Sequence, residues 1–210
     1  RGVMNVNAEI LMNVTPTATR VGGVENGVLH EIFIERTSPR GLVGNIYKGK
    51  IVRVLPGMQA AFVDIGLERA AFIHVAEIGS GDSSTPINQL VHEGQSLVVQ
   101  VTKDPINSKG ARLTTQLAIP SRYLVYMPGS VHVGISQKIE ETAERDRLKQ
   151  LVKDCMESEG LTGEVGFILR TAAEGVGEEE ITADTRYLRR LWRKLEERIK
   201  DNSAPSLVYD

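Results

Sequence analysis

Short stretches in which apolar and polar residues alternate open the chain. Such alternation, enriched in valine, isoleucine and aromatic residues, predicts β-strands with one buried face. We expect strands over residues 8–14, 19–25 and 28–35. The last two are joined by Asn26 and Gly27, a pair that suits the left-handed dihedral angles of a hairpin turn. A ribbon of this size is barely stable alone, so we expect it to pair with a further sheet.

A second series of strand-like stretches lies between residues 42 and 115. Residues that favour strands are enriched there, and a Pro-Gly pair at 56–57 ends the first strand. The further strands cover 59–65, a segment ending at His74, 95–102 and 111–115. Polar, breaker-rich residues at 79–88 indicate a surface loop.

The pattern changes after residue 116, where helical periodicity begins. Apolar residues recur at helical spacing over 140–158 and 177–200. Two short apolar strands are expected at 123–127 and 165–170. A series of strands followed by mixed strands and helices predicts an α+β protein.

Composition is typical of a globular chain, with 41% hydrophobic and 25% charged residues among 210. No apolar run is long enough to span a membrane, and the start lacks the pattern of a signal peptide. The single cysteine, Cys155, excludes an internal disulfide and fits a reducing compartment, so we expect a cytoplasmic protein. Because the net charge is -2, any nucleic-acid site must be a local basic patch.

Aromatic and basic side chains are mixed on the short strands between 42 and 75. Aromatic rings stack on bases and basic groups hold phosphates, so this mixture suits single-stranded nucleic acid. Alternation puts Phe62 on the same face as Asp64 and opposite Val63. Two interpretations stay open at this point: Phe62 and Phe72 are an exposed stacking pair, or they belong to the core. Arg69 and Lys109 are open in the same way, between RNA contacts and solvated turn charges.

A second candidate site follows the apolar strand 166–169, which ends in Arg170 and Thr171. A guanidinium matches phosphate oxygens with a planar fork, and a hydroxyl adds a donor. Backbone N–H groups of the small residues at 172–177 can join them. The alternative is an arginine that forms a structural salt bridge at the end of a strand.

The sequence shows no pattern of hydrolytic residues. We find no paired aspartates at metal-binding spacing, no serine triad, and histidines that are too scattered to be ligands. Asp64 lies in a motif typical of non-catalytic barrels. We therefore predict no catalytic and no metal-binding residue in this chain.

Eight motifs resemble the ribonuclease E/G family. They are ILMNVTP (10–16), EIFIER (31–36), GNIYKGKI (44–51), VLPGMQAAFVDIG (54–66), KGARLTT (109–115), SRYLVYMPG (121–129), VGISQKIE (133–140) and ILRTAAEGVG (168–177). The set is specific, whereas FVDIG alone is typical of any S-one-type RNA-binding barrel, a form of the OB-fold.

The resemblance implies a division into three parts. Residues 1–38 would be the N-terminal strands of a ribonuclease-H-like subdomain that is incomplete here. Residues 39–116 would form a five-stranded OB-fold barrel of the S-one type, and residues 117–210 an α/β 5′-sensor subdomain with a C-terminal helix.

The resemblance also implies roles for individual residues. On the barrel, RNA would be bound by Phe62, Phe72, Arg69 and Lys109. The mixture of aromatic and basic residues on the first barrel strand adds Tyr47 and Lys48 as candidates for RNA binding. In the sensor, Arg170 and Thr171 would bind a 5′-monophosphate, with Ser121 and Val125 completing the pocket. The chain departs from the family at Ser121, where we expect glycine, and at residues 137–138, where we expect two arginines.

The function implied is that of the RNA-binding portion of a single-strand-specific endoribonuclease acting in rRNA maturation and mRNA decay. Its partners would be single-stranded RNA, rRNA precursors and mRNA, and the full-length protein would be a homo-oligomer. Magnesium for cleavage and a linking zinc would be bound by later segments, so we expect this chain to bind RNA without cutting it.

Two other classes remain. A non-catalytic S-one-type RNA-binding module of a translation or RNA-decay protein explains residues 42–115 equally well, but it leaves ILRTAAEGVG and SRYLVYMPG unexplained. A structural or assembly domain would use the aromatic face against another protein.

Overall fold

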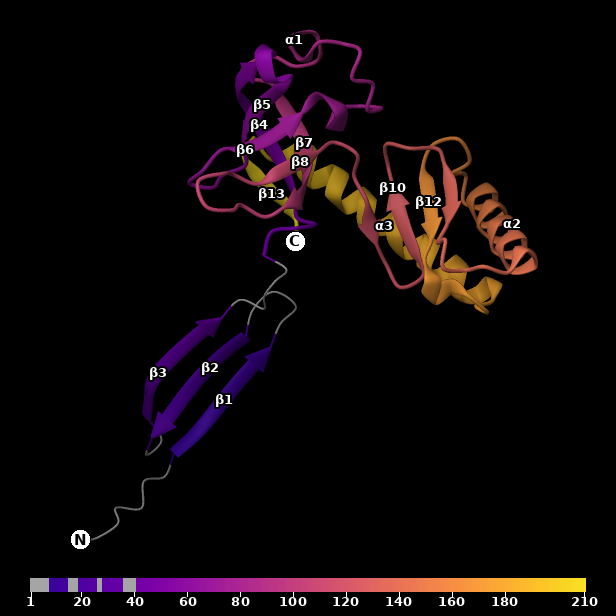
Figure 1. The fold of residues 1–210 in the computed structure, drawn as a ribbon. Coiled ribbons are helices and arrows are strands. Elements are labelled where there is room, and N and C mark those ends of the chain that lie inside the picture. Colours follow the sequence, from indigo (N-terminus) through magenta and orange to yellow (C-terminus); the bar gives the residue numbers. More distant parts are fainter. Residues whose placement is uncertain (1–7, 15–18, 26–27, 36–40) are drawn as a thin grey trace. The chain divides into compact units, whose positions relative to one another are not determined.

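The computed structural model describes residues 8–14, 19–25, 28–35 and 41–210. The chain divides into two compact units, Arg1–Val43 and Gly44–Asp210. The first unit contains a three-stranded antiparallel sheet in the order β1-β2-β3 (Figure 1). Its strands are β1 (Ala8–Val14), β2 (Thr19–Glu25) and β3 (Val28–Glu35). The three predicted strands are thereby confirmed, while the predicted turn at Asn26 and Gly27 lies outside the described residues.

A closed five-stranded barrel begins the second unit. Its strands are β4 (Ile46–Leu55), β5 (Ala60–Asp64), β6 (Ala71–His74), β7 (Ser96–Lys103) and β8 (Arg112–Thr114). They follow the order β4-β5-β6-β8-β7, and β7 pairs with β4 to close the barrel. Only β6 and β8 are parallel among these pairs. The predicted OB-fold barrel is confirmed.

Alternation along the strands fills the barrel. Side chains at every second position are almost fully buried, among them Ile51, Val63, Ile73, Val99 and Leu113. Gly49 lets two strands approach closely, because a Cβ there would lie 2.5 Å from Val63 Cγ1. Short helices connect the strands: η1 (Pro56–Met58), η2 (Val75–Glu77) and α1 (Ile87–Leu90), the last at the end of the predicted loop.

An α/β part follows the barrel. Its sheet has the order β11-β12-β10-β9, with β11 and β12 parallel. The strands are β9 (Ile119–Pro120), β10 (Leu124–Met127), β11 (Val133–Ile135) and β12 (Gly166–Leu169). The helices are α2 (Thr142–Ser158), η3 (Thr171–Ala173) and α3 (Glu178–Asp201). Both predicted long helices are confirmed.

The apolar faces of α2 and α3 form one core with this sheet. Leu148, Val152 and Cys155 of α2 and Leu188 and Leu195 of α3 are buried in it. Burying an aliphatic side chain of this size stabilises a fold by roughly 1.5–3 kcal/mol. The core also includes Ile46 and Val208, so it continues to the barrel.

The last strand, β13 (Ser206–Tyr209), was not predicted. It pairs antiparallel with β4, where Ser206 lies opposite Lys48 and Leu207 opposite Tyr47. The barrel sheet therefore has a sixth strand, in the order β13-β4-β5-β6-β8-β7. Figure 1 shows α3, drawn in gold, running from the α/β part back to the barrel. The pairing of β13, which follows α3, with β4 joins the barrel and the α/β part into one unit.

Lys48 strengthens this junction. Its Nζ donates hydrogen bonds to Ile199 O and Asn202 O, both at 2.8 Å, at the C-terminal end of α3. A cation there satisfies carbonyls that have no partner within the helix and complements the helix dipole. Arg198 Nη1 donates to Val208 O at 3.0 Å and holds β13 in turn.

Lys48→Met should lower the free energy of unfolding by about 1–2 kcal/mol, because two helix-end carbonyls lose a charged donor while the apolar stem is kept. Urea unfolding of the chain measures the change. Lys50→Met, on an exposed neighbour in the same strand, is the control and should change stability much less. Equal effects of the two substitutions would contradict the role given to Lys48.

Candidate nucleic-acid interface

A row of four side chains crosses the outer wall of the barrel. In the strand register, Arg53 lies opposite Phe62, Phe62 opposite Phe72, and Phe72 opposite Arg112. The two rings meet edge to face, with centroids 6.3 Å apart and planes inclined by 65°. Both arginines are exposed. We call Arg53, Phe62, Phe72 and Arg112 the barrel row.

The rings of the barrel row do not belong to the barrel core. Phe62 and Phe72 are half-buried, whereas Val63 and Ile73, the next residues along their strands, are fully buried. Successive side chains of a strand point to opposite faces, so the two rings lie on the outside. Of the two interpretations left open by the sequence, the structure favours a partly exposed aromatic pair.

Two loops place further cations beside the rings. Phe62, Phe72, Arg69, Lys109 and Arg112 line a hollow of about 540 Å³. Arg69 Nη1 donates to Asn107 O, which ties the loop after β5 to the turn before β8. Gly110 lets the same two segments approach closely, because a Cβ there would lie 2.0 Å from Ala70 O. Arg69 and Lys109 are thus held at the edge of the hollow and remain exposed.

Tyr47 and Lys48 do not belong to this surface, which corrects their assignment to RNA binding. Tyr47 is only 5% exposed and lies opposite Leu207 of β13, so its ring offers no free face. Lys48 donates to the carbonyls at the end of α3. The unpredicted strand β13 explains both outcomes, because it covers the edge of β4 on which these residues lie.

A second candidate site lies at the end of β12. Arg170 N donates to Tyr123 O at 2.8 Å, and Arg170 Nη1 donates to Ser121 O at 2.5 Å. The hydroxyl of Thr171 lies 2.8 Å from Ser136 Oγ. Val125 on β10 lies opposite Ile168 on β12 and is half-buried. The structure therefore brings Arg170 and Ser121 into contact. Thr171 follows Arg170 in the chain, and Val125 lies on the neighbouring strand β10.

The guanidinium of Arg170 is exposed and keeps donors available. Among the residues that the structure describes, it forms no salt bridge; the ion pairs there are Arg147–Glu144, Arg186–Glu159 and Arg189–Glu159. Its bond to Ser121 O uses one of five N–H groups. The sequence left open that Arg170 forms a structural salt bridge, but among the described residues it has no acidic partner.

Glu144 of α2 anchors the loop that follows Arg170. Its Oε2 accepts a hydrogen bond from Gly175 N at 2.5 Å, and Arg147 pairs with the same carboxylate. The bond from Arg147, and then that from Gly175, lower the pKa of Glu144 to about 2. The carboxylate thus holds the loop after residue 171 against α2.

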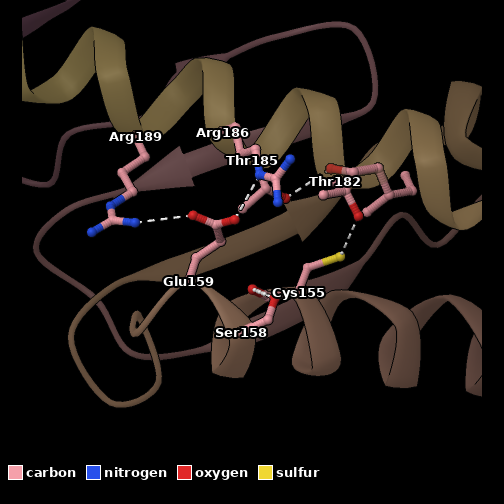
Figure 2. A network of polar contacts seen from close by, with 8 residues as sticks. Cys155, Ser158, Glu159, Thr182, Thr185, Arg186 and Arg189 are labelled. Carbon is pink, nitrogen blue, oxygen red and sulfur yellow. Dashed lines mark hydrogen bonds and ion pairs between the residues drawn. The ribbon is translucent and has the colours of Figure 1, made fainter.

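A polar network fixes α3 against the end of α2 (Figure 2). Glu159 accepts from Arg186 at 2.7 Å and from Arg189 at 3.0 Å. These contacts, led by the hydrogen bond from Arg186, lower the pKa of Glu159. Cys155 Sγ lies 3.2 Å from Thr182 Oγ1 within the same interface. The two arginines are therefore structural, and the cysteine is part of helix packing.

Sequence reasoning missed three residues of the two sites. Arg53 and Arg112 join the rings only through strand register, which the sequence did not define. Asp184 on α3 contacts the segment 121–124, which lies about sixty positions away in the chain. For Arg112 the sequence did hold a signal, because this residue belongs to the KGARLTT motif.

In the described ranges, no group of three or more His, Cys, Asp or Glu residues could hold a metal ion. The same residues include no helix that is long and apolar enough to cross a membrane. The predicted lack of catalytic and metal-binding residues stays a prediction.

Phe62→Leu and Phe72→Leu should each weaken binding of single-stranded RNA by about tenfold, since stacking on one ring contributes about 1–3 kcal/mol. Leucine keeps most of the apolar volume, so the melting temperature should change little. Fluorescence anisotropy with a labelled oligonucleotide measures the affinity. Val52→Ala, at an exposed apolar position of β4, is the control. Unchanged affinity, or loss of affinity only together with loss of fold, would contradict stacking on these rings.

The pKa of Glu144 predicts a pH dependence of stability. The folded-state pKa of about 2 lies below the ordinary value of 4.5. The carboxylate therefore contributes stability that is complete above about pH 4.5 and is lost as pH falls toward 2. Glu144→Gln should remove this part of the acid sensitivity, and Glu140→Gln should leave it intact. Identical pH profiles of unfolding for wild type and Glu144→Gln would show that the contact contributes nothing.

Comparisons with known proteins agree with this architecture. Residues 42–114 match the S1 RNA binding domain, and residues 118–210 match the Ribonuclease E/G family. The chain is 54% identical to Ribonuclease G of Escherichia coli (strain K12) over 97% of its own length and 43% of the relative's. It is 52% identical to Ribonuclease G of Haemophilus influenzae, with 96% and 42% covered. Ribonuclease E of Nostoc sp. is 38% identical over 79% of this chain and 24% of its own.

The chain spans less than half the length of these relatives. The similarity to Ribonuclease G nonetheless extends over nearly all residues of this chain. Because residues 118–210 match this family and the identity to Ribonuclease G of 54% extends over 97% of the chain, the chain belongs to the ribonuclease E/G family.

Proposed function

We propose that the chain is the RNA-binding portion of an endoribonuclease and that it contacts one RNA strand at two places. The barrel row would bind bases and phosphates of single-stranded RNA, and Arg170 would bind the 5′ end. The barrel row is the observation that carries this proposal, because it sets two adjacent rings between two exposed arginines. Membership of the ribonuclease E/G family supports it.

The barrel row has the chemistry of a platform for single strands. Two rings 6.3 Å apart give consecutive bases separate apolar surfaces. Arg53 and Arg112 at the ends of the row, with Arg69 and Lys109 at the hollow, supply positive charge for phosphates. This cluster is the local basic patch that a chain of net charge -2 requires.

The second site suits a 5′-monophosphate. Arg170 has free N–H groups on an exposed guanidinium, and the Thr171 hydroxyl lies next to it in the chain. Val125 offers a half-buried aliphatic surface for the terminal base. One guanidinium and few other donors match one phosphate, whereas a triphosphate brings charge that this small set cannot neutralise.

We assign cleavage to parts of such a protein that these residues do not include. In the described part of the chain, no group of three or more His, Cys, Asp or Glu residues could hold the magnesium or the linking zinc expected for the family. The 210-residue chain would thus hold RNA without cutting it. In the whole protein, a cytoplasmic homo-oligomer, it would serve rRNA maturation and mRNA decay.

A plain RNA-binding module is the second candidate function. It accounts for residues 42–114, which match the S1 RNA binding domain. It gives no role to residues 118–210, which match the ribonuclease E/G family, nor to the exposed Arg170. The two candidate functions differ in whether binding depends on the 5′ end group of the RNA.

Oligonucleotides of one sequence with a 5′-hydroxyl, 5′-monophosphate or 5′-triphosphate provide the test. The chain should bind the monophosphate most tightly, and Arg170→Ala should lower affinity for that RNA by about tenfold, as expected for losing charge-assisted hydrogen bonds. Affinity for the hydroxyl form should stay unchanged. Arg190→Ala, which removes another exposed arginine, is the matched control.

Indifference of the wild-type chain to the end group would favour the plain module. Equal losses for all three RNAs in Arg170→Ala would show that this arginine binds RNA without reading its end.

A further inference from the structure

Asp184, in the second turn of α3, makes a cluster of contacts with a segment far away in sequence. Its Oδ2 accepts hydrogen bonds from Tyr123 N at 3.0 Å and Leu124 N at 3.1 Å. The same oxygen lies 2.6 Å from Ser121 Oγ, which donates to it. Three donors on one half-buried carboxylate oxygen are enough to fix the conformation of the segment they come from.

Arg170 contacts the same segment through its backbone carbonyls. Arg170 N donates to Tyr123 O, and Arg170 Nη1 donates to Ser121 O. Ser121 N also donates to Leu124 O at 2.8 Å, which closes the segment into a turn. The carbonyl that orients the guanidinium therefore belongs to a turn whose amides and hydroxyl are bound by Asp184.

We propose that Asp184 is a positioning residue for the 5′-phosphate site. This inference rests on the proposed function of Arg170. By holding the turn, Asp184 fixes Ser121 O and so directs the exposed guanidinium before any RNA arrives. A free arginine side chain samples many rotamers, and orienting it in advance reduces the entropy that binding must otherwise offset.

Asp184 acts through the turn and not on the phosphate itself. A carboxylate and a phosphate repel each other, so direct contact would weaken binding. Its charge is instead compensated by the three donors of the turn. The helix that carries it is fixed in turn, because Glu159 binds Arg186 and Arg189, two and five residues further along α3 (Figure 2).

The same contacts give Ser121 a different role from the one expected. Its hydroxyl is directed to Asp184, so it is not available as a donor to phosphate. Its carbonyl is what meets Arg170. Serine can therefore occupy a position where the family resemblance led us to expect glycine, because its side chain turns toward α3.

The test compares the dissociation constants of two RNAs of one sequence, with a 5′-hydroxyl or a 5′-monophosphate. Their ratio in the wild-type chain defines the monophosphate preference. Asp184→Ala should reduce this preference by about tenfold, while affinity for the hydroxyl form stays within about twofold. Asp184→Asn should give an intermediate loss, because its amide oxygen still accepts from the turn. Glu197→Gln, which removes a charge from an exposed position of α3, should change neither constant.

The outcomes separate this inference from the function on which it rests. If the wild-type chain shows no monophosphate preference, the proposed function is refuted, and this inference with it. The same holds if Arg170→Ala keeps the whole preference. If Arg170→Ala loses the preference but both Asp184 variants keep it, only the role of Asp184 is refuted. Equal weakening for both RNAs would show a merely structural effect and would also refute it. Should Asp184→Ala not fold, Asp184→Asn decides by the same ratio.

Discussion

The antiparallel pairing of β13 with β4 is the contact on which the arrangement of residues 44–210 depends. It returns the end of the chain to the barrel after α3 has passed along the α/β part (Figure 1). Lys48 reinforces it by binding carbonyls at the end of α3, and Ile46 and Val208 carry the core across the junction. A barrel and an α/β part linked by one loop would move independently, whereas these contacts make them a single unit.

This junction also decides which surfaces are free for the proposed binding of RNA. β13 covers the part of β4 that carries Tyr47 and Lys48. The barrel row lies elsewhere on the wall, across β4, β5, β6 and β8, and β13 does not pair with its residues. At the other end of the unit, α3 supplies Asp184 to the turn beside Arg170. One helix therefore takes part in both the junction and the site that we propose for the 5′ phosphate.

Much of the fold could be predicted from local patterns, because strands with strict alternation and helices with long apolar faces leave clear periodicities. The short strand β13 leaves none: its residues, Ser206–Tyr209, gain their conformation from pairing with β4. The misassigned Tyr47 follows from that omission. Motifs identified Phe62 and Arg170, but Arg53 became visible only once strand register was defined. Register and helix-to-turn contacts are tertiary properties, which no window of sequence contains.

Hydrogen exchange of the chain with RNA bound tests most directly the claim that one unit holds one strand at two places. With a 5′-monophosphorylated oligonucleotide, protection should increase both in strands β5 and β6 and in the segments around residues 121–125 and 170–175. With the 5′-hydroxyl form, only the strands should gain protection. Protection confined to the barrel with both RNAs would contradict the account.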